Sequence, residues 1–395
     1  MDYRGYNLSA IADYFSAGCK SKKQLGLELE HFIVDRGTGL SLPYPNGVER
    51  VLLALQPAYG RGVFSGEHII GIAREKAPIT LEPAAQLEIS IGPCCALHEI
   101  AEIYAHFRHA LAPILDAMEC DMVCAGYHPK STIEALPMIP KERYDFMYKH
   151  FQSTGTHGKY MMKGTAATQV SIDFADEADF SRKFRVANVL GPLLALLCDN
   201  ARVFEGEPYA GRMLRTHIWN NVDPSRSAIA TGALEKDFGF RDYAAYVYDA
   251  PCVFAHGRPV SAVFAHRAME PEEITQAVSM MFPDVCLKNH IEIRVADSMP
   301  IESAMGYLAL IKGIFYDSKN FDTLHRETTH LRGTDVSHAK EALMEKGAQA
   351  WVYGKTGADW LDTLFAMAKR GLPGADLPFL LELEKNWRPS NEGVE

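Results

Sequence analysis

The chain has 395 residues, of which 47% are apolar and 23% charged, and its formal net charge is −10. This composition is typical of a globular protein with a large core, and the acidic balance argues against non-specific binding of nucleic acid. No apolar run approaches the ~20 residues that a membrane-spanning helix needs, so neither nucleic acid nor membrane is an expected partner.

Apolar periodicity and breaker residues predict the following elements in chain order. First come a helix at 5–18, a strand at 25–34, a turn-rich segment at 37–47, a strand at 79–91 that Pro83 interrupts, and a helix at 96–118 with a kink at Pro113. Then come a strand at 168–174, a helix at 177–202 interrupted at Gly191-Pro192, strands at 215–219 and 290–296, a helix at 301–315, a mainly helical part at 337–384, and a frayed tail at 389–395. Because strands and helices do not alternate strictly, we expect an α+β fold.

Four of the predicted strands carry acids or amides on one face, because alternate strand residues share a face. These faces hold Glu28 and Glu30; Gln86, Glu88 and Ser90; Gln169, Ser171 and Asp173; and Glu292 and Arg294. A sheet with one face in water would give the same alternation. Acids are depleted in strands, however, and clustered carboxylates repel one another unless cations neutralise them. Hard oxygen ligands in this number favour Mg²⁺ or Mn²⁺ over zinc.

Several magnesium ions beside carboxylates indicate phosphate chemistry, which also needs cationic side chains nearby. The candidates are Arg294 beside Glu292, then Arg215 and Arg226, and Lys141, Arg143 and Lys163 ahead of the strand at 168–174. The segment Gly354-Lys355-Thr356 is not a phosphate loop, because residue 349 is Gln where that motif needs its first Gly. A nucleotide is therefore expected on a sheet face.

The N-terminus has no apolar signal core, so nothing in it indicates secretion. The eight cysteines lack the paired spacing of zinc sites and are expected to be reduced thiols. Together these features predict a cytoplasmic protein.

Six short segments carry a family resemblance. They are LGLELEHF at 25–32, LEPAAQLE at 81–88, PKERY at 140–144, TQVSIDF at 168–174, RTHIW at 215–219 and IEIRVAD at 291–297. They resemble, in the same order, the GxExExF, LEPGGQxE, PKxRY, QVNLDF, RSHIW and ExRxAD motifs of plant-type glutamate–cysteine ligases. The resemblance covers roughly residues 20–316 and is specific as a set.

The resemblance implies a glutamine-synthetase-like fold, in which a curved antiparallel sheet forms a funnel-shaped site and helices cover its outer face. It implies one catalytic domain over residues 1–388, with the motifs in 20–316 and a helical part at 337–388. It also implies glutathione biosynthesis as the pathway. In the reaction, ATP phosphorylates the γ-carboxylate of glutamate, and the amine of cysteine attacks the acyl phosphate to give γ-glutamylcysteine.

The same resemblance assigns roles to single positions. Glu28, Glu30, Glu88 and Glu292 match the metal-binding glutamates, so Mg²⁺ or Mn²⁺ is the implied metal and ATP the co-substrate. Arg294 and Arg215 are the expected catalytic residues. Arg294 would stabilise the transferring phosphoryl group, and Arg215 would hold a substrate carboxylate or a nucleotide phosphate. Lys163, Gln169, Arg226 and Arg294 are the expected nucleotide-binding residues, and a monomer or homodimer is expected.

Three segments depart from the family pattern. Ala84-Ala85 replaces a Gly pair, Ser171 replaces Asn, and Asn220-Asn221-Val222 replaces Thr-Asp-Thr. These changes leave the glutamates intact but leave the amine acceptor open. The alternatives are the same ligase chemistry with another acceptor and a non-catalytic nucleotide-binding homologue.

Overall fold

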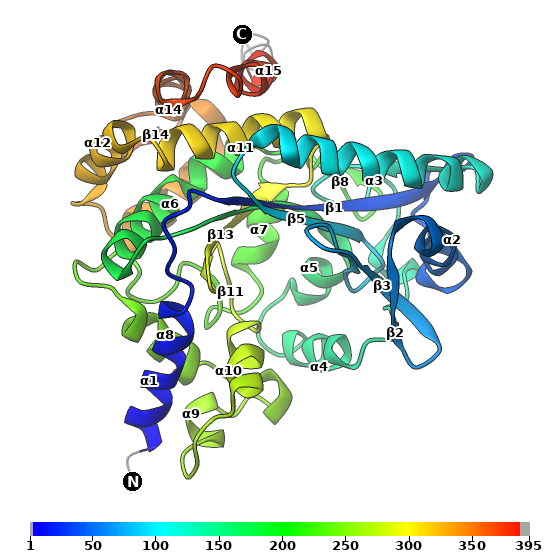
Figure 1. The fold of residues 1–395 in the computed structure, drawn as a ribbon, viewed down its shortest axis with the longest axis horizontal. Coiled ribbons are helices and arrows are strands. Elements are labelled where there is room, and N and C mark those ends of the chain that lie inside the picture. The colour runs from blue at the N-terminus through cyan, green and yellow to red at the C-terminus, as the bar shows by residue number, and fades with distance from the viewer. Residues whose placement is uncertain (1–2, 388–395) are drawn as a thin grey trace.

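The structure is a computed structural model that describes residues 3–387. A nine-stranded antiparallel sheet lies at its centre (Figure 1). Its strands are β1 (Leu25–Asp35), β2 (Arg61–Ser65), β3 (His68–Ala73), β4 (Ile79–Leu81), β5 (Leu87–Cys94), β6 (Cys120–Val123), β7 (Ala167–Ile172), β12 (Val285–Leu287) and β13 (Ile291–Asp297). The order is β12-β13-β7-β1-β5-β4-β3-β2, and β6 pairs with the second half of β1. The mixed, antiparallel architecture confirms the α+β prediction.

Helices cover the sheet on both sides. The helices are α1 (Tyr3–Ser16), α2 (Glu49–Tyr59), α3 (Leu97–Ala117), α4 (Glu142–Phe151), α5 (Gly158–Gly164), α6 (Glu177–Leu197), α7 (Leu214–Asn220), α8 (Phe240–Asp249), α9 (Val260–Val263), α10 (Pro271–Val278), α11 (Ile301–Phe315), α12 (Ser318–Thr328), α13 (Gly333–Lys346), α14 (Gly357–Gly371) and α15 (Leu377–Trp387). Figure 1 shows α3 and α11 on one side of the sheet and α4, α5 and α7 on the other. Within residues 3–387, no helix combines the length and apolar character that crossing a membrane requires.

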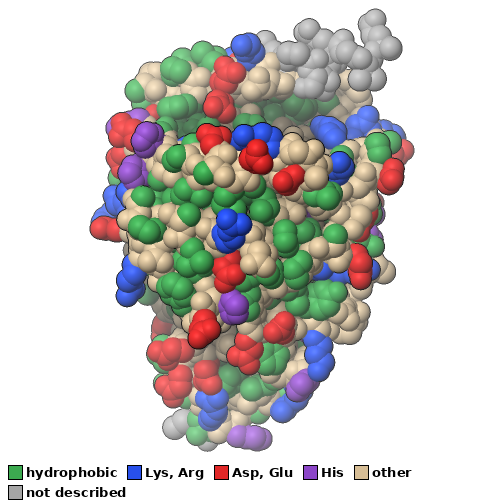
Figure 2. All heavy atoms as spheres, turned by 90° about the vertical axis from the view of Figure 1, so that its right-hand side faces the viewer, with side chains coloured by type: hydrophobic (Ala, Val, Ile, Leu, Met, Phe, Trp, Pro, Cys, Tyr) green, Lys and Arg blue, Asp and Glu red, His purple; other side chains and the backbone are tan. Residues whose placement is uncertain are grey.

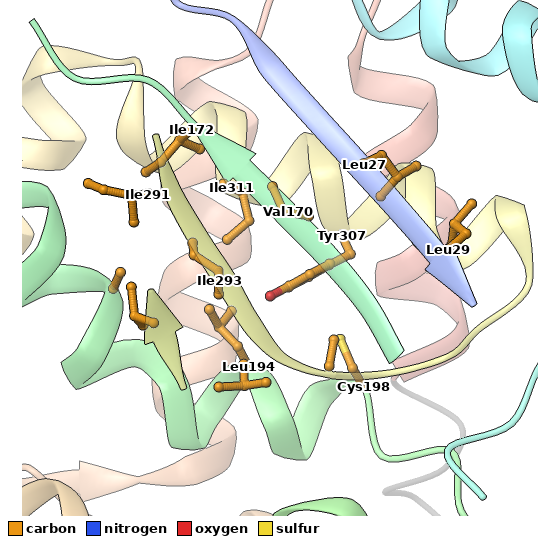
Figure 3. Close-up of a cluster of buried hydrophobic side chains, with 14 of the residues drawn as sticks. Leu27, Leu29, Val170, Ile172, Leu194, Cys198, Ile291, Ile293, Tyr307 and Ile311 are labelled. Carbon is orange, nitrogen blue, oxygen red and sulfur yellow. The ribbon is translucent and has the colours of Figure 1, made fainter. Parts of the chain in front are cut away.

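The apolar face of the central strands packs against α6 and α11 (Figure 3). The side chains of Leu27, Val170 and Ile293, one from each of β1, β7 and β13, are completely buried. They meet Leu194 of α6 and Tyr307 of α11, which are also completely buried. Because successive strand residues point to opposite faces, this packing fixes which side chains β1, β7 and β13 present on the other face.

The segment 215–219, predicted as a strand, is the helix α7. Thr, Ile and Trp favour strands, but Leu214 and Ile218 are the buried apolar residues, and their spacing of four is helical. The Arg215 guanidinium also lies 5.5 Å from the Trp219 ring centroid, a contact that suits positions i and i+4 of a helix.

The predicted strand at 79–91 is a hairpin of β4 and β5 rather than one interrupted strand. The chain reverses after Pro83, where the amide of Ala85 donates to the carbonyl of Glu82 at 2.9 Å. Ala85 has a φ of +66°, the left-handed region that favours glycine, and it stands where the related motif has Gly. The break at Pro83 was predicted correctly, but the reversal was not.

The helix predicted at 177–202 ends at Leu197 and runs without interruption through Gly191-Pro192. Residues on both sides of Pro192 are buried, and this packing outweighs the ~3 kcal/mol by which Pro disfavours a helix interior. The C-terminal part is helical as expected, apart from the short pair β14 (Trp351–Val352) and β15 (Lys355–Thr356). The predicted tail at 389–395 lies outside the described residues, and the single domain over 1–388 stays a prediction.

The sequence patterns missed β2, β3 and α2, which form one end of the molecule. Figure 2 views this side, where acidic, basic and hydrophobic side chains are interspersed. Leu53, Val63 and Phe64 are 42–50% exposed. Exposed apolar residues weaken the alternation that identifies a strand or helix, and this explains the omission.

Candidate active site

The four glutamates predicted as metal ligands lie on the sheet face opposite the apolar core. In the strand register, Glu28 faces Ser90 of β5 and Gln169 of β7, and Glu30 faces Glu88. Glu292 of β13 pairs with Ser171 of β7. We call Glu28, Glu30, Glu82, Glu88 and Glu292 the carboxylate cluster; Glu82, which follows β4, joins it in the structure.

A continuous chain of hydrogen bonds crosses this face from β13 to β1. Both oxygens of Glu292 accept from cations, Oε1 from Lys288 Nζ at 2.6 Å and Oε2 from Arg294 at 2.7 Å. Arg294 also donates to the side-chain oxygen of Gln169, whose amide donates to Glu30 Oε1 at 3.0 Å. The structure thus joins four of the predicted site residues, Glu30, Gln169, Glu292 and Arg294, in one network.

Burial and mutual repulsion govern the protonation of the cluster. Burial raises the pKa of Glu28 to about 8, and the charges of Glu292 and Glu88 add to the effect. Burial likewise raises the pKa of Glu88 to about 7, together with the charge of Glu82. Burial alone would also raise the pKa of Glu292, but Lys288 and Arg294 hold it well below its usual range. Glu28 and Glu88 therefore hold a proton more strongly than exposed carboxyls do, whereas Glu292 is ionised beside its two cations.

Glu82 and Lys288 are cluster residues that the sequence reasoning missed. Glu82 precedes Pro83, where the strand was expected to break, so no face could be assigned to it. The charges of Lys141, Arg294 and Arg143 lower its pKa against the larger effect of burial, which raises it. Lys288 precedes β13 in the hairpin after β12, and only the hairpin register reveals that it reaches Glu292.

Arg215 is a buried cation whose guanidinium makes no hydrogen bond in the part of the chain that the structure describes. Its side chain is 6% exposed, and it donates no hydrogen bond within residues 3–387; its Nε is fully buried without a partner. The Trp219 ring of α7 packs against the Arg215 guanidinium, which lies 5.5 Å from the ring centroid. The Arg294 guanidinium lies against the same ring at 5.9 Å. Burial lowers the pKa of Arg215, and the charge of Glu30 opposes that change. A buried guanidinium with free donors is suited to an anionic ligand.

Two predicted nucleotide-binding residues are not brought to the cluster. Arg226 is 1% exposed. Its guanidinium donates hydrogen bonds to Asp223 at 2.7 Å and to the carbonyls of Met280 and Pro251. All three of its guanidinium nitrogens thus donate within the protein, where they hold the loop after α7 in place. Lys163 lies in the last turn of α5. Burial lowers the pKa of its ammonium, and the charges of Glu134 and Glu205, which are not part of the cluster, oppose that change.

A cavity of about 460 Å³ adjoins the cluster at Glu28. Gly26, Ser90 and Ser171, from three adjacent strands, hollow the polar face at this point. A Cβ on Gly26 would lie 3.2 Å from the Ser171 Cβ, so even one methyl group would narrow the space. The cavity is also lined by the cationic residues Lys20, Arg74 and Lys76 and by Gln24, Asp173, Asn289 and His290.

The residues present fit a hard divalent cation by their chemistry. They offer buried and half-buried carboxylate oxygens, the ligands that Mg²⁺ prefers, and both burial and the neighbouring carboxylates raise the pKa values of Glu28 and Glu88. As they stand, the side chains of residues 3–387 form no group of three or more His, Cys, Asp or Glu arranged to hold a metal. Lys288 and Arg294 form ion pairs with the two oxygens of Glu292.

Comparison with known proteins identifies relatives over most of the chain. Residues 24–386 match the family model described as glutamate–cysteine ligase family 2. The chain is 30% identical over 333 residues to the chloroplastic glutamate–cysteine ligase of Nicotiana tabacum and 31% identical over 330 residues to that of Arabidopsis thaliana. These matches cover 80% and 79% of this chain but only 64% and 63% of the relatives.

A solved structure confirms the expected glutamine-synthetase-like fold. The crystal structure of glutamate–cysteine ligase from Francisella tularensis, in complex with AMP, superposes with a TM-score of 0.55 at 12% identity. The superposition covers 94% of this chain and 84% of that one. At this identity the likeness concerns the fold alone.

The expected cytoplasmic location is contradicted, because the plant relatives are named as chloroplast proteins. That expectation used the lack of an apolar N-terminal core and the cysteines expected to be reduced, both of which argue against secretion. Chloroplast transit peptides are amphipathic and rich in Arg and Ser, so the lack of an apolar core does not distinguish the two compartments.

Proposed function

We propose that this chain, which belongs to glutamate–cysteine ligase family 2, joins the γ-carboxylate of glutamate to the amine of cysteine at the expense of ATP. The observation that carries the proposal is the carboxylate cluster with Arg294 inside it, bordered by the cavity on one side and by Arg215 on the other. Such a site has places for a nucleotide, for its metal and for an anionic substrate.

The glutamates of the cluster would hold Mg²⁺ or Mn²⁺. When bound, the metal would offset the negative charge of the polyphosphate and of the phosphoryl group in transfer. Its charge would also oppose the burial and the repulsion between carboxylates that together raise the pKa values of Glu28 and Glu88. ATP would lie in the cavity, with its base over the small residues Gly26, Ser90 and Ser171 and its phosphates directed toward Glu28.

The arginines bind and orient the reacting groups. Arg294, fixed by Glu292 and Gln169, would donate to the phosphoryl oxygens, where a preformed cation needs no reorganisation during reaction. Arg215 would bind a carboxylate of the amino-acid substrate through its free donors. The amino acid would then approach from the α7 side and the nucleotide from the cavity, so the two reacting groups meet at the cluster.

ATP is needed because a carboxylate is a poor electrophile toward an amine in water. A γ-carboxylate oxygen of glutamate attacks the γ-phosphorus, the bond to the bridging oxygen breaks, and ADP leaves. The amine nitrogen then attacks the acyl carbon, a C–N bond forms, the C–O bond to phosphate breaks, and a proton is released. The products are the γ-glutamyl amide, ADP and phosphate.

The test is an ADP-release assay with the purified chain, Mg²⁺ and glutamate, in which the amine is varied. We expect ADP release to require both glutamate and cysteine and to match γ-glutamylcysteine, measured by mass spectrometry. Release that needs glutamate and a different amine would replace cysteine as the acceptor. Release independent of any amine, or calorimetry without magnesium-dependent ATP binding, would contradict the proposal.

A further inference from the structure

Two cations oppose the binding of a metal ion to Glu292 in the arrangement described above. Glu292 is completely buried, and its two oxygens accept from Lys288 at 2.6 Å and from Arg294 at 2.7 Å. A metal ion that takes one of these oxygens as a ligand is repelled by the cation already there. Metal binding at Glu292 is therefore strengthened when one of the two cations moves away.

Arg294 is the less mobile of the two. Its side chain is 15% exposed, and besides Glu292 it contacts Gln169 and lies against the rings of Trp219 and Phe282 at 5.9 and 6.0 Å. Its backbone lies where the pairing of β13 with β7 is interrupted, and its amide donates to the carbonyl of Asp284 at 2.9 Å. Moving the guanidinium would break contacts with β7, with α7 and with Glu292 together.

Lys288 is held much more loosely. Its ammonium has one hydrogen bond within residues 3–387, to Glu292, and its side chain is 32% exposed. It lies in the turn between β12 and β13, and the next two residues, Asn289 and His290, line the cavity beside Glu28. A rotation of its flexible side chain can therefore take the ammonium from Glu292 toward this cavity.

We propose that Lys288 acts as a counter-cation for the carboxylate cluster in the metal-free protein, releases Glu292 when a metal–nucleotide complex binds, and then contacts the nucleotide phosphates. The proposal rests on the proposed function, because it takes the cluster as the metal site and the cavity as the nucleotide site. Lys288 is thus a positioning residue that makes metal binding depend on the nucleotide. Metal alone must compete with the ammonium, whereas metal bound to a polyphosphate provides a new anionic partner for it.

The test measures metal affinity rather than turnover. Mn²⁺ binding to the nucleotide-free full chain is followed by calorimetry for the wild type and for Lys288→Met, which keeps the side-chain length and removes the charge. We expect Lys288→Met to bind Mn²⁺ at least about tenfold more tightly, a factor in line with the loss of one competing charge-assisted hydrogen bond. The wild type should bind Mn²⁺ tightly only with a non-hydrolysable ATP analogue.

Lys369→Met is the matched control. Lys369 is 36% exposed and pairs at 2.5 Å with the buried Glu384, so the same change removes a similar ion pair from α14, on the outer layer of the molecule. It should leave Mn²⁺ affinity unchanged. Circular dichroism of each variant checks the fold, and Lys288→Gln replaces Lys288→Met if the latter does not fold.

Equal or weaker Mn²⁺ affinity in a folded Lys288 variant would overturn the proposal while leaving the metal site in place. Glu292→Gln separates the two claims. If Mn²⁺ binding with the ATP analogue is the same in Glu292→Gln and wild type, the metal role of Glu292 fails, and with it the reason for Lys288 to move. Absence of metal binding under every condition would overturn both.

Discussion

Replacing each of two buried arginines by Met tests whether Arg215 is a ligand-binding residue. Arg215 donates no hydrogen bond within residues 3–387, whereas Arg226 donates to Asp223, Met280 and Pro251. Charge-assisted hydrogen bonds contribute about 1.5–3 kcal/mol each, and breaking a buried ion pair costs about 3–5 kcal/mol. We therefore expect Arg226→Met to lower the free energy of unfolding by about 3–5 kcal/mol, and Arg215→Met to change it by less than ~1 kcal/mol.

Activity should respond in the opposite order. Arg215→Met removes the two or so charged hydrogen bonds proposed for the substrate carboxylate, about 3–4 kcal/mol, which lowers kcat/KM by about 10²- to 10³-fold. Arg226→Met should retain kcat/KM within about tenfold at a temperature where it is folded. Urea unfolding gives the stability of both variants, and ADP release gives their kinetics. The reasoning is refuted if Arg215→Met loses as much stability as Arg226→Met, or if it keeps full kcat/KM.

Three further outcomes are expected. Glu292→Gln should lose turnover while its circular dichroism stays native, and full activity would remove Glu292 from the proposed metal site. Burial, together with neighbouring carboxylates, raises the pKa values of Glu28 and Glu88 to about 8 and about 7, so these two carboxyls bind more protons in the folded protein than in the unfolded chain above about pH 4.5. Burial lowers the pKa values of His31 and His128 to about 4, which has the opposite effect on stability below about pH 6.5. Metal-free stability in urea should therefore fall as pH rises from about 6.5 to 8, and Mg²⁺ with an ATP analogue should reduce the fall; a pH-independent midpoint in this range would contradict this. Gly26→Val should fill the cavity floor beside Ser171 and raise KM for ATP by about tenfold or more, while Val63→Thr, on the exposed part of β2, should leave it unchanged.

Much of the carboxylate cluster could be predicted from the sequence because strand periodicity is local. Once 25–34 is recognised as a strand, Glu28 and Glu30 must share a face opposite Leu27 and Leu29. The same rule placed Gln169 and Glu292 on the polar faces of their strands. It could not place strands next to one another, so the pairing of Glu30 with Glu88 became known only from the register.

The sequence predictions were wrong or incomplete where tertiary contacts determine the role of a residue or the type of an element. Arg215 and Arg226 look alike in the sequence, yet the first donates no hydrogen bond within residues 3–387, whereas each guanidinium nitrogen of the second donates to a carbonyl or to Asp223. Lys288 and Glu82 lie at turns, where alternation gives no face. The helix α7 was read as a strand because five residues with β-branched and aromatic side chains carry too little periodicity to distinguish the two.

The place of β1 in the sheet has a consequence for biosynthesis. β1 pairs with β5 at residues 87–94 but also with β7, about 140 positions later in the chain, and β7 in turn pairs with β13. The ribosome synthesises the N-terminus first, so residues 25–29 of β1 have no partner on one edge until β7 has been synthesised. Lys288 and Arg294, whose charges act on Glu28, are synthesised later still. Pairings of such long sequence separation form slowly. During synthesis, the exposed backbone edge and uncompensated acids of this nascent strand are therefore what a molecular chaperone would have to shield.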